Sequence, residues 1–96
     1  MRPAHSYFVE IFKEHTGIPM LDGSPKSNVN YARLIETKIR HQLGKDLEMS
    51  PKDVPIARVV EGFETLLQQS DKDDWIRKNM TDLRLLHYKF LEILNK

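Results

Sequence analysis

Cysteine is absent from the 96-residue sequence, and its absence removes several kinds of chemistry. Disulfide bridges, thiolate zinc sites and cysteine nucleophiles are all excluded. No apolar run is long enough to cross a bilayer, and the first six residues lack the apolar stretch of a signal peptide. Because a chain without cysteine fits a reducing compartment, we expect a cytoplasmic protein with no membrane partner.

An excess of one charge is also missing. The chain has 15 lysine and arginine residues against 14 aspartate and glutamate residues, for a formal net charge of +1. This balance excludes a polycationic DNA-coating protein and an acidic tail. Hydrophobic residues make up 40% of the chain, which is enough for a core and too much for a disordered protein. The length predicts a single domain over residues 1–96.

Catalytic and ligand-binding motifs are lacking as well. The glycines are isolated from one another, so no phosphate-binding loop is present. The aspartates of residues 71–74 lack the calcium-loop pattern, and no Gly-x-Ser-x-Gly motif occurs. The histidines, which have no metal-ligand spacing, are His5, His15, His41 and His87. We expect no enzymatic activity, no cofactor, no metal and no small-molecule substrate.

Helical periodicity is what the sequence does contain. Apolar residues recur three and four positions apart, and no alternating stretch predicts a strand. The expected helices span residues 4–16, 28–43, 56–69 and 82–95, and residues 70–74 resemble the start of a further short helix of at most two turns. The predicted fold is all-α, a compact bundle of four or five helices. Its two long connections favour orthogonal packing over an up-and-down arrangement.

Glycine and proline mark the expected helix ends. Gly17 and Gly44 are the expected C-terminal caps of the first two long helices. Ser50 and the proline after it resemble a helix start, but Pro55 would break a helix that began there. Either a short turn precedes the third helix or Asp53 is its cap.

Three apolar residues are candidates for contact with a protein partner. Trp75 is the single tryptophan and is expected to fill the gap between the third and last helices. The alternative is that Trp75 is a binding hot spot for a partner. Met20 and Leu21 belong to the connection 17–27, which is expected to lie against the body of the domain and to offer a second apolar contact.

Charge is distributed unevenly along the chain. Residues 26–45 carry five basic residues and one acid, and residues 77–89 carry four basic residues and one acid. Residues 61–74, between them, carry five acids and one lysine. The basic segments predict contacts with nucleic-acid phosphates. The alternative is a solvated exterior paired with acids of neighbouring helices. The candidate nucleic-acid-binding residues are Arg33, Lys38, Arg40, Lys45, Arg77, Lys78 and Arg84.

Four segments, in this order, resemble a known family. The run His5–Gly17 resembles the first helix of an α-helical domain in phage and mobile-element replication proteins. Asn30–Glu36 resembles the helix that follows it. Gly62–Lys78 is similar to a helix with an early phenylalanine and an acidic, tryptophan-containing end, and Leu83–Phe90 is similar to the final helix. The order resembles the C-terminal domain of replication-initiator, replisome-organiser-like proteins over nearly the whole chain.

This resemblance implies a non-catalytic accessory module for DNA replication that contacts DNA, a helicase or a helicase loader. In that family a winged-helix domain usually precedes the helical domain, and none is present here. The chain is therefore expected to be either a fragment of a longer protein or a free-standing relative. The alternative function is a helical protein–protein interaction domain of a regulatory protein with no nucleic-acid role.

Overall fold

The first helix, α1, has the bounds that the sequence predicts. The computed structural model describes residues 2–18 and 25–95, and α1 spans Ala4–Thr16. Gly17 ends it with a φ of 72°, in the left-handed region, and its backbone N–H donates to the carbonyl of Lys13. Phe8 and Phe12 are fully buried on its inner side.

The second helix, α2, is longer than the predicted 28–43. It spans Pro25–Leu47. The helix can begin at Pro25 because a proline in the first turn costs no hydrogen bond. Gly44 does not end it, so that prediction is wrong. Glu48 adopts the left-handed conformation instead, with a φ of 55°. The N–H of Met49 donates to the carbonyl of Gly44 at 2.9 Å, which is the long bond of a Schellman motif.

Gly44 has a different function, which is to make room for the chain that returns past the end of α2. A Cβ atom at this position would lie 2.8 Å from the carbonyl oxygen of Met49 and 3.3 Å from the nitrogen of Pro51. Both neighbours are backbone atoms, so they cannot move aside as a side chain would. The glycine therefore permits a tight turn into the next element.

A short turn precedes the third long helix, which is one of the two alternatives the sequence left open. This turn is the 3-10 helix η1, Pro51–Asp53. It is followed by α3, Ile56–Ser70, whose N-cap is Pro55 and not Asp53. The prolines thus separate two helical elements.

The C-terminal third is divided into three short helices. The helix α4 spans Asp74–Asn79, and Asp73 caps it by accepting a hydrogen bond from the N–H of Ile76. One helix was expected over 82–95, but the chain forms α5, Arg84–Tyr88, and α6, Phe90–Leu94. The break lies at Lys89, with φ −101° and ψ 13°. The described residues thus form six α-helices and no strand, so the all-α prediction is confirmed and the number of helices was underestimated.

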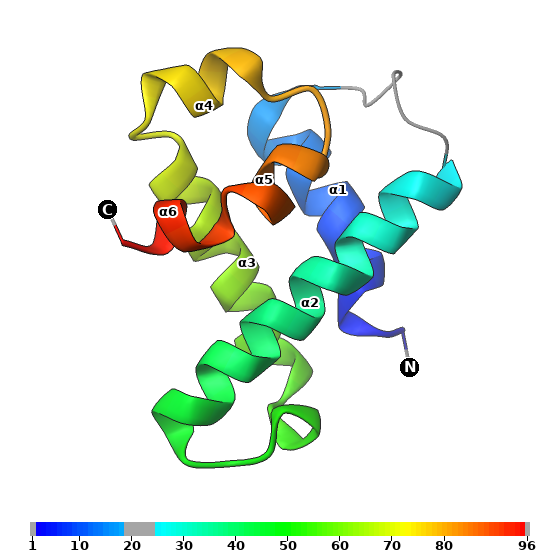
Figure 1. The fold of residues 1–96 in the computed structure, drawn as a ribbon. Helices are drawn as coiled ribbons and strands as arrows, with labels where there is room; N and C mark the ends of the chain where they lie inside the picture. Colours follow the sequence, from blue (N-terminus) through cyan, green and yellow to red (C-terminus); the bar gives the residue numbers. More distant parts are fainter. Residues whose placement is uncertain (1, 19–24, 96) are drawn as a thin grey trace.

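The core lies where the long helices cross. Figure 1 shows α2 crossing α3 steeply, with α1 behind the N-terminal half of α2 and with α4 to α6 toward the C-terminal end of α3. The ring of Phe8 stacks on Phe63 with centroids 4.2 Å apart. Ile76, Leu86 and Ile93 bring each of the short helices into the same core. On α6, Leu91 is 69% exposed, whereas Ile93 is fully buried.

Candidate nucleic-acid interface

The four basic residues predicted on α2 do not share one face. Arg33 and Lys45 are exposed, whereas Lys38 and Arg40 are half-buried. At 100° per residue, Arg33 and Lys38 point roughly 140° apart around the helix axis. Neither Arg33 nor Lys45 has an ion pair within the described ranges 2–18 and 25–95.

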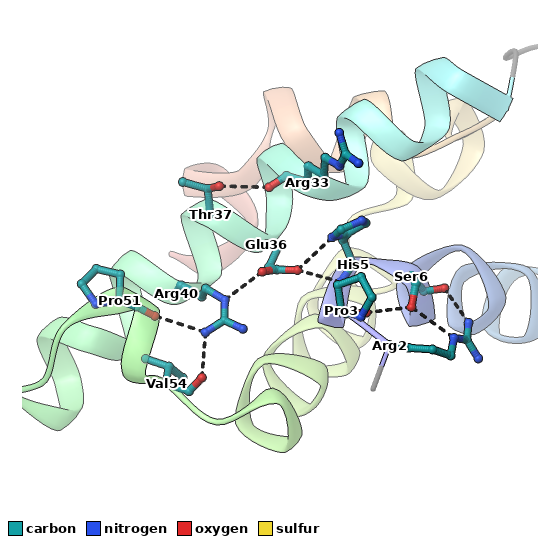
Figure 2. A network of polar contacts seen from close by, with 10 residues as sticks. All are labelled: Arg2, Pro3, His5, Ser6, Arg33, Glu36, Thr37, Arg40, Pro51 and Val54. Atoms are coloured by element: carbon teal, nitrogen blue, oxygen red, sulfur yellow. Dashed lines mark hydrogen bonds and ion pairs between the residues drawn. The ribbon is translucent and has the colours of Figure 1, made fainter.

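Arg40 is held inside a polar network that joins three elements (Figure 2). Its Nε donates to the carboxylate of Glu36 at 2.8 Å. Its Nη1 donates to the carbonyl oxygens of Val54 at 2.7 Å and Pro51 at 3.2 Å. The other carboxylate oxygen of Glu36 accepts the backbone N–H of His5 at 2.7 Å. We call Arg40, Glu36, His5 and these two carbonyls the Arg40 network.

The Arg40 network stabilises the ionised form of Glu36. Burial by itself would raise the pKa of this carboxyl group, but the hydrogen bonds from Arg40 and His5, together with the positive charge of Arg40, outweigh it. The pKa of Glu36 is consequently lower than its ordinary value. Arg40 therefore neutralises a half-buried carboxylate and fixes the turn after α2. A residue that binds phosphate is expected to be exposed, whereas Arg40 is half-buried.

Lys38 is also engaged by the protein. Its Nζ donates to the backbone carbonyl of His87 at 2.8 Å and lies 5.7 Å from the centroid of the Phe90 ring. This lysine fastens α2 to the junction of α5 and α6. Burial and the positive charge of Lys38 together lower the pKa of His87.

Three aromatic side chains gather beside this lysine. The ring of Tyr88 lies 5.0 Å from that of His87 and 6.2 Å from that of Tyr31. The nearby Tyr88 side chain, together with burial, raises the pKa of Tyr31. Tyr88 is nevertheless 69% exposed, so one side of an anchored aromatic ring is open to solvent.

The predicted residues of α4 lie at the surface. Arg77 is paired with Asp74 at 2.8 Å across one helical turn, with both side chains more than half exposed. Such exposed pairs are worth little and exchange readily with other partners. Lys78 is exposed and has no ion pair with any residue that the structure describes.

Arg84 combines a structural contact with exposure. Its Nε donates to both carboxylate oxygens of Asp82, at 2.9 and 3.1 Å, and its backbone N–H donates to one of them. The side chain of Asp82 is 4% exposed and that of Arg84 is 52% exposed. The buried acid thus orients an arginine whose outer part faces water.

Trp75 does not fill a gap in the core, so that expectation is wrong. It is 56% exposed, and its neighbour Ile76 is the residue of α4 that is buried. The ammonium group of Lys89 lies 5.4 Å from the centroid of the Trp75 ring, which links α4 to the α5–α6 junction. The other two candidates for partner contact, Met20 and Leu21, lie outside the described residues.

A shallow hollow separates α4 from α5. It has a volume of about 240 Å³ and is lined by Asn79, Thr81, Asp82, Arg84, Leu85 and Tyr88. Trp75 and Asn79 are four residues apart, so they lie on one side of α4, and Arg84 and Tyr88 are likewise on one side of α5. We call Trp75, Lys78, Asn79, Arg84 and Tyr88 the α4–α5 surface.

Tyr88 and Asn79 were missed by the sequence reasoning. The signal available for Tyr88 was its place between a histidine and a lysine, off the apolar stripe of the last helix. An aromatic residue that lies off the apolar stripe of its helix does not face the core, so it contacts another helix or solvent.

A second concave feature lies between α2, α3 and α6. This groove has a volume of about 270 Å³. Ile39, Leu43, Phe90 and Leu94 form its apolar part, and Asp46 and Glu61 are among its polar lining residues. A Cβ atom at Gly62, which also lines it, would lie 2.9 Å from the Cγ2 atom of Ile39, so this glycine lets α3 approach α2 closely.

The described part of the chain lacks two features, one required for a metal site and one for a membrane-spanning helix. It contains no group of three or more histidine or acidic side chains placed to hold a metal ion. None of its helices combines the length and hydrophobicity that spanning a bilayer requires.

Comparison with known proteins adds no relationship. No family model matches the chain, and neither a curated protein nor a solved structure is significantly similar to it. The similarity to replication-initiator domains therefore depends only on the residues quoted for it and stays a prediction.

Proposed function

We propose that this domain is a non-catalytic module that binds DNA through the α4–α5 surface and serves as an accessory in replication. One observation carries the proposal, which is the joint exposure of basic and aromatic side chains on α4 and α5. Lys78 and Trp75 are exposed on α4, and Arg84 and Tyr88 have more than half of their side chain or residue exposed on α5. Cations attract the phosphate backbone, and exposed aromatic rings offer contacts to bases and sugars.

The replication setting is supported only by the resemblance of the sequence to replication-initiator domains. A helicase or its loader is the protein partner that this resemblance implies. The DNA contact has the separate support of the exposed cations and can be tested first.

The test measures DNA affinity as a function of salt. Fluorescence anisotropy with labelled single- and double-stranded oligonucleotides should show affinity that falls steeply between about 50 and 200 mM salt. Lys78→Glu should weaken binding about tenfold, since a phosphate contact is replaced by repulsion.

The matched control is Lys13→Glu, which makes the same change of charge on α1. Lys13 is exposed and has no ion pair among residues 2–18 and 25–95. Its reversal should change affinity much less than reversal of Lys78. Absence of binding at the lowest salt, or equal loss in both variants, would contradict the proposal.

The groove between α2, α3 and α6 favours a second candidate, a protein-interaction domain. Its apolar floor fits the row of apolar side chains on one face of a partner's helix. The charged residues that line the groove are of both signs, because Arg58 lies there beside Asp46 and Glu61 and pairs with Glu61 at 3.8 Å, so the apolar floor alone carries this candidate. This function predicts no DNA signal at any salt concentration and protection of Leu43 and Leu94 in the complex.

A further inference from the structure

Tyr88 is exposed, and its ring nevertheless contacts two neighbouring rings. Its ring lies edge-on to the Tyr31 ring, with the centroids 6.2 Å apart, and its centroid lies 5.0 Å from that of the His87 ring, while 69% of the residue remains exposed. An exposed aromatic side chain ordinarily loses conformational entropy when a ligand orders it. Here part of that loss has already occurred, so the ring is preorganised for contact with a flat ligand.

The hollow beside Tyr88 supplies the other groups that a nucleotide needs. Arg84 lines it with a guanidinium group oriented by Asp82. Asn79 and Thr81 add polar groups, and Leu85 adds an apolar one. The Asn79 amide donates to the carbonyl of Trp75 at 2.7 Å, which fixes its position on α4.

We infer that the α4–α5 surface binds single-stranded DNA in preference to duplex, with one unpaired base stacked on Tyr88 and its phosphate near Arg84. This inference rests on the proposed function. In duplex DNA both faces of each base are covered by neighbouring bases, so no base face is open to the tyrosine. In single-stranded DNA each base can leave its neighbours and stack on a side chain.

The experiment compares one oligonucleotide with its own duplex. Wild-type protein should bind the single strand at least tenfold more tightly at equal salt. Tyr88→Ala should weaken single-strand binding about tenfold, the range expected for loss of one stacked base, and should change duplex binding less than twofold. Tyr88→Phe keeps the ring and should retain most of the affinity.

Leu91→Ala is the matched control, because Leu91 is also 69% exposed and lies on the adjacent helix α6. It should leave single-strand affinity unchanged. Circular dichroism and thermal melting of each variant check that it folds. Ultraviolet cross-linking of wild-type protein to oligothymidine, mapped by mass spectrometry, provides a readout that needs no variant and should identify Tyr88.

The possible results separate this inference from the proposed function. Equal affinity for single strand and duplex, equal losses in Tyr88→Ala and Leu91→Ala, or cross-links only at other residues would overturn the stacking inference and leave DNA binding intact. Failure of wild-type protein to bind either form of DNA would overturn both.

Discussion

The Arg40 network and the α4–α5 surface both contain an arginine beside a carboxylate, but the two arginine side chains differ in how much of them is exposed to solvent. The Arg40 side chain is 17% exposed and bonds to one carboxylate and two carbonyls. The Arg84 side chain is 52% exposed. A basic residue is therefore a poor candidate for binding phosphate when acceptors within the protein already occupy its hydrogen-bond donors, as they do for Arg40.

The largest effect should come from removing Arg40. Arg40→Ala leaves the Glu36 carboxylate and two carbonyls without their main donor, so the free energy of unfolding should fall by about 2–3 kcal/mol. Urea denaturation measures it. Arg33→Ala, on the same helix but exposed, should change it by less than about 0.5 kcal/mol. An equal loss of unfolding free energy in the two variants would show that the Arg40 network stabilises the protein no more than an exposed arginine does.

A smaller effect, on DNA affinity and not on stability, is expected from a change on the α4–α5 surface. Lys78→Ala should lower the slope of log affinity against log salt by about 0.7–0.9, which corresponds to one lost phosphate contact. The urea midpoint should stay at the wild-type value, because no internal ion pair of the described chain is broken. An unchanged slope would exclude Lys78 from the interface.

The pH dependence of stability sharpens the comparison further. A carboxyl group whose folded pKa is lowered stabilises the protein above its ordinary pKa and loses this contribution as the pH falls through the folded value. Wild-type stability should therefore decrease as the pH falls below the ordinary value of 4.5 for Glu36. Glu36→Gln should be less stable at neutral pH and should show a flatter acid decline in denaturation curves.

The smallest effect should arise at His87. Its folded pKa is lower than the ordinary 6.5, because of burial and the charge of Lys38. The unfolded chain binds this proton more readily, so stability should decline as the pH falls from 6.5 toward the folded value. His87→Gln should flatten the decline, and an identical decline in that variant would assign it elsewhere.

Much of the fold could be predicted because its determinants are local. The helix over 4–16 was predicted correctly, since Gly17 supplies the left-handed stop that the chain uses. The break at Lys89 was not predictable from periodicity, because the apolar pattern continues from Leu86 through Phe90. The end of α2 was misplaced because Glu48 adopts a conformation usually taken by glycine.

The candidate site was less predictable because its exposure depends on distant parts of the chain. Arg40 bonds to carbonyls 11 and 14 residues further along, and Lys38 to one 49 residues further along. No spacing rule within a helix anticipates such bonds. Trp75 was misplaced because Ile76, adjacent to it, fills the core position on α4.

The break at Lys89 has one more consequence. It divides the C-terminal end of the chain into two short rods, of which α5 packs against α2 and α6 packs against α3. A tilt of α5 would re-aim the ring of Tyr88 and would also displace Leu86, which is fully buried on the same helix, whereas Phe90 and Ile93 belong to α6. The direction in which Tyr88 points is therefore tied to the packing of one five-residue helix and not to the whole C-terminal segment.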